Sequence, residues 1–275
     1  MKNKLNYLNL GCGKKFHNSW VNVDMTSNSK DVQTYNLLKG IPFSDNSFEV
    51  IYHSHFLEHL PKEKAADFIK ECNRVLKTDG IIRVVVPDLE NIVDEYKKFL
   101  KQNLENPNEM SEVNYEWIMM EMYDQTVRNY SGGQMSEFLK RDNIINEKYV
   151  LDRIGHVGRN IRDNYLKNDN SFAKNIKKVF SSPAMFRNGF KYFFNKIFYR
   201  TKVSKIGKFR LGGEIHMWMY DRYSLQKLLK DCGFVNISLK NPYESYIPNW
   251  SEYQLDVKDG LVIDPTSLFM EAQKK

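Results

Sequence analysis

The sequence is poor in cysteine and lacks a long hydrophobic run. Its three cysteines, Cys12, Cys72 and Cys232, are scattered over 275 residues. So small and odd a set favours reduced thiols over a disulfide framework or a cysteine-rich zinc site. No stretch approaches the roughly 20 apolar residues that a bilayer span requires, and the opening MKNKLNYLNLGCG lacks the apolar run of a signal peptide. We therefore expect an ordinary globular protein located in the cytoplasm.

Acidic residues are missing from one long segment. Residues 171–213 contain eleven Lys and Arg and no Asp or Glu, although the whole chain has a formal net charge of only +7. Within this segment, residues 183–200 place aromatic side chains at helical spacing on one side and cationic side chains off that stripe. Packing of the aromatic side on the protein core is the simpler interpretation. The alternative is peripheral contact with the inner face of a membrane through residues 183–200.

The first ninety residues alternate strand and helix patterns. Four strands are predicted at YLNL, WVNVDM, FEVIYHS and IIRVVVPDL, and the last is the near-continuous apolar run typical of a buried parallel strand. Apolar residues spaced three and four apart predict a helix over 62–76 that closes with KTDG. This alternation predicts an α/β fold with a doubly wound, Rossmann-like sheet.

The alternation stops after Asp88 and resumes near residue 211. Residues 91–210 show helical periodicity and no convincing strand, which predicts a long, mainly helical insertion or lid. The later part contains the helix pattern SLQKLLKDCGF and the strand patterns VNISLK and SLFMEAQK. We therefore expect a core made of residues 1–90 and 211–275, and a helical insertion at 91–210 that binds substrate.

The first strand runs into a short glycine turn. A dinucleotide-binding fingerprint has three glycines and an acidic residue about 20 residues further on. Here Asp24 follows Gly13 by eleven residues, and Phe16 stands where the third glycine belongs. Gly11 and Gly13 would let the backbone approach a ligand closely, and the Asp24 carboxylate could accept hydrogen bonds from two ribose hydroxyls. A plain turn and a solvated carboxylate are the alternatives.

Four motifs in order, LNLGCG, VNVDM, PFSDNSFEVI and ECNRVLKTDGIIRVVVPD, resemble class I S-adenosylmethionine (SAM) dependent methyltransferases. The glycine turn resembles in particular the predicted methyltransferases of bacterial surface-polysaccharide gene clusters. The resemblance covers roughly residues 5–90 and 216–240, and it implies SAM as cofactor and a sugar hydroxyl of a glycan precursor as methyl acceptor. Asn9 and Asn36 stand where many such proteins carry Asp. The implied cofactor-binding residues are Leu10, Gly11, Cys12, Gly13, Asp24, Met25, Asn36, Leu37 and His53.

Histidines gather where the third predicted strand ends, in the sequence HSHFLEHL. Because the carboxyl ends of strands line the ligand crevice of a doubly wound sheet, His53 or His55 should approach the cofactor. A neutral imidazole of His55 or His59 is the natural base for a hydroxyl acceptor at pH 7, although His59 could instead be structural. We predict no metal site, because the complete HExxH pattern is missing and no cysteine lies nearby.

Two further residues are candidates for catalysis. Asp88 could bind substrate hydroxyls or a divalent ion, but a helix N-cap is the expected role. His216 follows the insertion and could lie over the substrate, or it could be a buried hinge residue. Polar loops of the insertion could hold an anionic or sugar substrate or could simply be ion-paired; their candidate residues are Arg128, Tyr130, Arg153, His156 and Arg159.

These patterns predict a cytoplasmic SAM-dependent methyltransferase that O-methylates a sugar of a surface-glycan precursor. An RNA methyltransferase is the enzymatic alternative, since the basic aromatic segment could bind nucleic acid. No recognised RNA-binding module is evident, so nucleic acid is not the expected partner. A catalytically inactive SAM-fold protein that binds or regulates a partner is the third possibility, which Asn9 and Asn36 keep open. The patterns define no oligomeric state.

Overall fold

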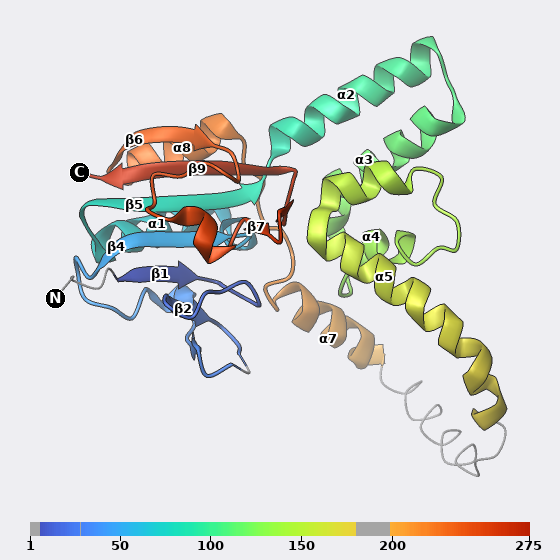
Figure 1. The fold of residues 1–275 in the computed structure, drawn as a ribbon, viewed down its shortest axis with the longest axis horizontal. Helices are drawn as coiled ribbons and strands as arrows, with labels where there is room; N and C mark the ends of the chain where they lie inside the picture. Colours follow the sequence, from blue (N-terminus) through green and yellow to red (C-terminus); the bar gives the residue numbers. More distant parts are fainter. Residues whose placement is uncertain (1–5, 28, 180–198) are drawn as a thin grey trace.

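The computed structural model describes residues 6–27, 29–179 and 199–275, and it is built on one mixed sheet of seven strands (Figure 1). The strand order is β3-β2-β1-β4-β5-β9-β6, in which β3 to β5 run parallel and β9 runs antiparallel to both neighbours. The predicted α/β fold is confirmed. The strands are β1 (Tyr7–Leu10), β2 (Val21–Asp24), β3 (Val32–Thr34), β4 (Phe48–Ser54), β5 (Leu76–Pro87), β6 (Phe234–Lys240) and β9 (Ser267–Lys274).

Two amphipathic helices, α1 (Lys62–Val75) and α8 (Arg222–Asp231), cover one face of the sheet. The apolar positions predicted for α1 are buried, because residues three and four apart share one side of a helix. Asp221 begins α8 with a capping box, in which its Oδ1 accepts a hydrogen bond from the Ser224 amide at 2.7 Å. The prediction that KTDG closes α1 was wrong: α1 ends at Val75, and these residues form an irregularity at the start of β5.

The opposite face of the sheet is covered by the segment 241–266, which was not predicted. This segment contains the short helix η3 (Trp250–Tyr253) and a hairpin of β7 (Val257–Lys258) and β8 (Leu261–Val262). Its apolar residues pack against side chains that point from β1, β4, β5 and β9 to this face. The buried cluster consists of Tyr7, Trp20, Val50, Tyr52, Val85, Ile247, Trp250, Leu255 and Phe269.

The helical part of the chain lies at the carboxyl ends of the parallel strands (Figure 1). It has its own buried core around Trp117, whose side chain is fully buried and donates a hydrogen bond to Glu121 at 2.8 Å. Its helices are α2 (Leu89–Glu105), α3 (Glu109–Val127), α4 (Gly133–Phe138), α5 (Glu147–Val179) and α7 (Tyr199–Arg210).

The helical part contacts the sheet domain closely at Gly155, where α5 is interrupted. Gly155 has φ +56°, and a Cβ there would lie 2.2 Å from the Ile263 carbonyl oxygen, so only glycine fits. The next amide, that of His156, donates a hydrogen bond to the same oxygen at 3.0 Å. This contact holds α5 against the segment that leads into β9.

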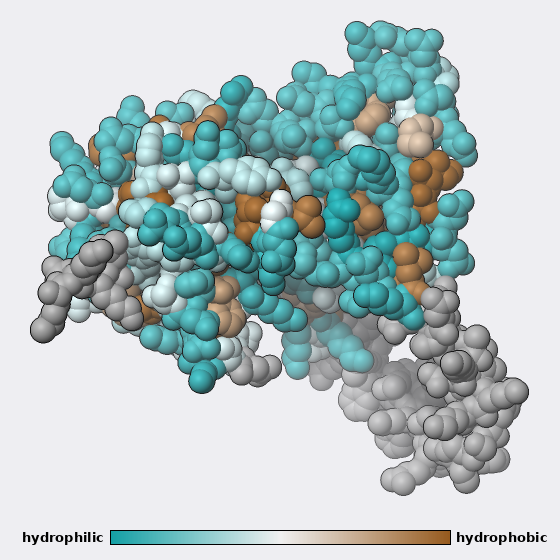
Figure 2. Space-filling model, viewed as in Figure 1, coloured by the Kyte–Doolittle hydropathy of each residue, from teal (hydrophilic) through white to brown (hydrophobic). Residues whose placement is uncertain are grey.

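The surface seen in Figure 2 is mainly hydrophilic, and its hydrophobic groups are small and separated. Scattered apolar groups of this kind are normal on a protein surface. Among the described residues, no helix is long and apolar enough to cross a membrane. Residues 180–198, which contain most of the basic aromatic segment 183–200, lie outside the described residues, so its proposed membrane contact stays a prediction.

Candidate active site

The glycine turn after β1 has the conformation that its two glycines permit. Gly11 and Gly13 have φ values of +62° and +51°, which L-residues with a side chain rarely adopt. A Cβ on Gly11 would lie 2.2 Å from the ring of Phe56, whereas no described atom lies within 4 Å of a Cβ on Gly13. The turn is therefore packed beneath Phe56 at Gly11 and open at Gly13, where a ligand could approach the backbone.

Asp24 lies beside this opening at the end of β2. Its Oδ2 accepts a hydrogen bond from the Gly13 amide at 2.8 Å, and its Oδ1 accepts one from the Thr26 amide at 3.1 Å. Each carboxylate oxygen can accept a second hydrogen bond, so the side chain retains capacity for a ribose hydroxyl on each oxygen. The geometry leaves room for a ribose at Asp24, and the role of these residues in binding SAM stays a prediction.

Asn9 occupies a position where many methyltransferases that the sequence resembles carry Asp, and its amide group donates hydrogen bonds that a carboxylate could not. Its buried Nδ2 donates to the Lys15 carbonyl at 2.9 Å and to Asn22 Oδ1 at 3.2 Å. A carboxylate could make neither contact, because it has no proton to donate. Asn9 therefore fixes the short loop that stands in place of a full first helix.

The remaining predicted cofactor residues lie around the same strand ends. Asn36 and Leu37 are held near Asp24 by the backbone, because the amide of the preceding residue, Tyr35, donates to the Asp24 carbonyl at 2.8 Å. Asn36 caps the short helix η1 (Leu37–Lys39) by accepting from the Leu38 amide at 3.0 Å. Met25 is exposed, whereas Cys12 is buried, and this burial together with nearby Asp24 raises the pKa of its thiol to about 12. Leu10 and Leu37 belong to the buried core.

His53 points away from the crevice into the core. Side chains alternate along a strand, and His53 shares the α1 face of β4 with Ile51. Its ring is fully buried and packs edge-on against Phe68, with ring centroids 5.3 Å apart. Burial lowers the pKa of His53 to about 4, so the ring is neutral at pH 7. The structure places this residue beneath Phe56 and not in an open site.

A cavity of about 510 Å³ lies between the helical part and the carboxyl ends of β4 and β5. Its size is within the range of small-molecule sites. Its lining includes His55, His59 and His216, three of the four predicted catalytic residues, together with Lys15 from the loop after the glycine turn. The predicted cofactor residues do not line this cavity, so the two sets form neighbouring sites.

His55 stands at the end of β4 in a left-handed conformation, with φ +51°. Such backbone strain in a residue other than glycine is common at functional sites. Its Nδ1 lies 3.1 Å from Glu58 Oε1, and its Nε2 lies 3.0 Å from Ser267 Oγ and 3.4 Å from Asp264 Oδ2. Burial alone would lower the pKa of His55, but Asp264 and Glu58 outweigh it and raise that pKa.

Glu58 is a buried carboxylate beneath the cavity, in the short helix η2 (Leu57–His59). Burial alone would raise the pKa of Glu58, but His55 and, more weakly, His216 and His59 lower it to about 2. The backbone carbonyl of Glu58 accepts from the Met217 amide at 2.7 Å and so holds the chain that follows the insertion. His216 is thereby placed over η2, where burial lowers the pKa of its ring to about 3.

The other polar candidates have structural partners. Asp88 caps α2 by accepting from the Glu90 amide at 3.0 Å, as expected, and burial raises the pKa of its carboxyl. Three arginines of the helical part are ion-paired, and two of them, Arg128 and Arg153, also line the cavity, so a role in substrate binding stays a prediction. The pairs are Arg128 with Glu214 at 3.2 Å, Arg153 with Glu121 at 2.7 Å, and Arg159 with Asp152 at 2.9 Å.

The site also contains three residues that the sequence did not indicate, Lys15, Asp264 and Ser267. Lys15 Nζ donates to Asp264 Oδ2 at 2.6 Å and to Ser54 Oγ at 3.1 Å. Because β9 is antiparallel to β5, its first residue, Ser267, pairs with the last residue of β5 and so lies at the same edge as the parallel strand ends. Polar residues just before the last predicted strand were the one available signal.

Comparison with known proteins adds the class of protein. Residues 8–84 match the family model described as a methyltransferase domain. This match identifies a methyltransferase domain within the chain, and it implies S-adenosylmethionine as the cofactor. A search of the curated proteins found no match.

Solved structures with a similar arrangement include three proteins of low identity. A SAM-dependent methyltransferase from Archaeoglobus fulgidus is 11% identical over 99% of this chain and 87% of its own, with a TM-score of 0.39. One from Thermotoga maritima, described as a possible histamine N-methyltransferase, is 11% identical over 98% and 82%, with a TM-score of 0.38. The YcgJ protein from Bacillus subtilis is 20% identical, with a TM-score of 0.26, and the match spans 36% of this chain and 51% of that protein.

Proposed function

We propose that this protein transfers the methyl group of SAM to a hydroxyl of a sugar in a surface-glycan precursor. The sugar acceptor is suggested by the resemblance of the glycine turn to predicted methyltransferases of polysaccharide gene clusters, which is support by association. The cavity beside the strand ends would hold the acceptor, and the helical part would act as its lid. Gly11, Gly13 and Asp24 would hold the cofactor.

The observation that carries the proposal is the environment of His55. Its imidazole lines the cavity, and its Nε2 is 3.0 Å from the hydroxyl oxygen of Ser267, which also lines the cavity. An acceptor hydroxyl that entered the cavity beside Ser267 could approach the same nitrogen. The arrangement therefore suits a base that receives a proton from an alcohol.

Two carboxylates would stabilise the product of that proton transfer. As the acceptor oxygen took the methyl group from the sulfonium sulfur, which would keep the bonding electrons, the acceptor proton would pass to His55 Nε2. The positive imidazolium then lies between Glu58 and Asp264, which hold and orient it in the way that an aspartate supports a catalytic histidine. When bound, SAM supplies the electrophilic methyl group in this in-line displacement.

The charges around the cavity favour a neutral acceptor over a polyanion. Three cations line it, Lys15, Arg128 and Arg153, and each forms an ion pair with a carboxylate of the protein. Nucleic-acid binding depends mainly on cations that are available to phosphates. A sugar needs hydrogen-bonding groups and apolar surface, and the cavity offers both in Gln125, Thr126, Met122 and Ile154.

The test is methyl transfer to a panel of nucleotide-linked and lipid-linked sugars, with product detected by mass spectrometry. His55→Ala should lower kcat by about 100-fold or more on the best acceptor and leave SAM affinity nearly unchanged, because a general base acts only during the chemical step. His17→Ala, in the loop outside the cavity, is the matched control. Methylation of RNA but of no sugar, or full activity of His55→Ala, would contradict the proposal.

A further inference from the structure

A cluster of three side chains lies beside His55: Glu58, His59 and His216. The proposed proton transfer to His55 gives the two histidines of this cluster no role. One ligand atom from each residue lies within 4.8 Å of the other two. Glu58 and His59 belong to η2, while His216 comes from the chain that returns after the insertion. The cluster borders the cavity through the two histidines.

The Glu58 carboxylate is buried, and one of its two oxygens has no partner among the described residues. Its side chain is 1% exposed, and neither oxygen accepts a hydrogen bond from any residue that the structure describes. His55 Nδ1 is close, at 3.1 Å, but is not aligned to donate, and His59 Nε2 lies 4.0 Å away. His55 offsets part of the charge at Oε1, but Oε2 has neither a hydrogen bond nor an ion pair within the described residues, and a buried oxygen of this kind can bind a cation.

The two histidines present the atoms that a metal ion binds. His59 Nδ1 lies 3.1 Å from the Ile215 carbonyl oxygen, and this contact requires a proton on Nδ1. Nε2, which lies 4.0 Å from Glu58 Oε1, is then left to bind a cation. A histidine that donates its other N–H to a carbonyl is the usual arrangement in metal sites.

His216 completes the set from the opposite side. Its ring is 9% exposed and packs edge-on against His59, with ring centroids 4.8 Å apart. Within the described part of the chain, its ring nitrogens make no hydrogen bond. A nearly buried imidazole without a hydrogen-bond partner is free to be a ligand.

We propose that Glu58, His59 and His216 bind one divalent transition-metal ion of the Zn²⁺ or Mn²⁺ type. Two histidines and one glutamate are a donor set of catalytic zinc sites, in which water or substrate occupies the fourth position. Bond lengths of about 2.0–2.2 Å require ligand atoms roughly 3.3 Å apart, so the side chains need to converge by about 1.5 Å at most. The sequence predicted no metal, because the HExxH pattern is incomplete and no cysteine lies nearby. His216, far along the chain, supplies the further ligand.

The ion would have a defined role if the proposed function is correct. Its open position would face the cavity, where it could bind the acceptor oxygen and make the hydroxyl more acidic, while His55 takes the proton. This role rests on the proposed function, but the metal site does not, because it follows from the three side chains alone.

The experiment is a metal titration of the full chain after treatment with a chelator. Co²⁺ binding is followed by visible absorption and Zn²⁺ binding by calorimetry, for wild type, Glu58→Gln, His216→Gln and the control His17→Gln. We expect one ion per chain in wild type and the control, and at least tenfold weaker binding in both site variants. Thermal unfolding of each metal-free protein shows that it is folded, and His216→Gln decides the outcome if Glu58→Gln does not fold.

Two results would overturn the metal site: no binding by wild type at millimolar Co²⁺ or Zn²⁺, or equal binding by wild type and both site variants. SAM titration of the same samples separates this inference from the proposed function. A protein that binds the ion through these residues and binds SAM, yet methylates no sugar, would contradict the acceptor and support the metal site.

Discussion

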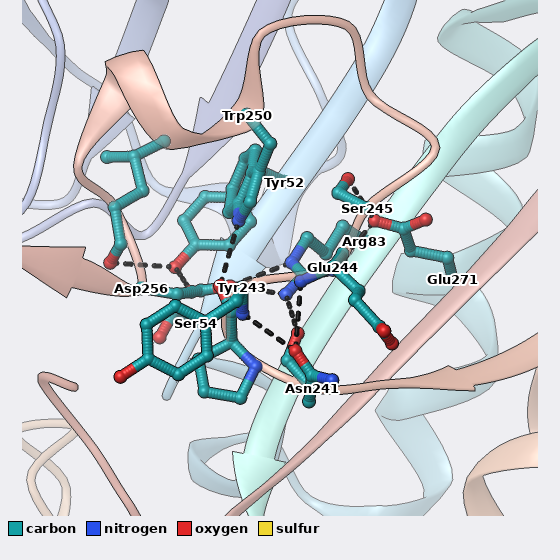
Figure 3. A network of polar contacts seen from close by, with 12 residues as sticks. Tyr52, Ser54, Arg83, Asn241, Tyr243, Glu244, Ser245, Trp250, Asp256 and Glu271 are labelled. Atoms are coloured by element: carbon teal, nitrogen blue, oxygen red, sulfur yellow. Dashed lines mark hydrogen bonds and ion pairs between the residues drawn. The ribbon is translucent and has the colours of Figure 1, made fainter.

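Replacing Arg83 by methionine should destabilise the protein by about 3 to 5 kcal/mol. The Arg83 side chain is fully buried on β5, beneath the segment 241–266 (Figure 3). Its Nε donates to Asp256 Oδ2 at 2.8 Å, and its Nη1 donates to Glu271 Oε1 at 2.7 Å. Two more donors reach the carbonyl oxygens of Glu244 and Asn241, at 3.0 and 2.9 Å. One guanidinium therefore joins two buried carboxylates and two backbone groups.

The magnitude follows from what the substitution would leave behind. Methionine has a similar length, so little volume is lost, but Asp256 and Glu271 would remain buried without their cation. Their other partners are neutral: the Tyr52 hydroxyl donates to Asp256 at 2.7 Å, and the Tyr246 amide donates to Glu271 at 2.8 Å. Breaking a buried ion pair from one side typically costs 3–5 kcal/mol, whereas replacing all its charges can be nearly neutral. Arg83→Met combined with Asp256→Asn and Glu271→Gln should therefore recover part of the loss.

The assay is urea unfolding followed by circular dichroism and by tryptophan fluorescence, to which the buried Trp20 and Trp250 contribute. Arg222→Met is the control, because Arg222 pairs with Glu90 at 2.7 Å but is 62% exposed, and exposed pairs contribute at most about 1 kcal/mol. A loss of less than about 1 kcal/mol for Arg83→Met would refute the argument. So would a triple variant less stable than Arg83→Met alone.

Two further predictions concern the cofactor site and the pH dependence of stability. Asp24→Ala should weaken SAM binding at least tenfold, because a hydrogen bond to a charged group contributes about 1.5–3 kcal/mol. Calorimetric titration with SAM, with Asp31→Ala as the control, would show whether Asp24 belongs to the site. The pKa of His53 is about 4 in the folded protein, below its ordinary value of 6.5. Below pH 6.5 the unfolded chain therefore takes up a proton that the folded chain does not. The free energy of unfolding should fall between pH 6.5 and 4 by at most about 3 kcal/mol. His53→Phe should lose this part of the acid sensitivity in urea titrations at several pH values, whereas His17→Gln should keep it; equal slopes in wild type and His53→Phe would disprove the assignment.

The strands of the sheet could be predicted from sequence because burial leaves a direct pattern in it. The apolar runs of β1, β4 and β5 and the alternation in β2 follow from packing on one or both sheet faces. β3 and the β7–β8 hairpin are only two or three residues per strand, too short to show a period. The cover of the second face was missed because loops carry no period at all.

The histidines of the sequence HSHFLEHL illustrate the same limit within the site. The sequence indicated that a strand ends among these histidines, but it did not indicate which of them still follow the two-residue alternation. His53 follows it and faces the core, whereas His55, with φ +51°, leaves the strand and faces the cavity. Asp264 and Ser267 could not be assigned to His55, because an antiparallel strand more than 200 residues away brings them there.

The segment from Asp256 to Ser267 connects stability to the site. At its start Asp256 joins the Arg83 network, and the Asp256 carbonyl accepts from the Ile263 amide at 2.9 Å. The Ile263 carbonyl in turn receives the His156 amide of the helical part. The next residue, Asp264, pairs with Lys15 and faces His55. Because these contacts follow one another along a single short segment, loosening it at Arg83 should displace both the carboxylate beside His55 and the docking point of α5.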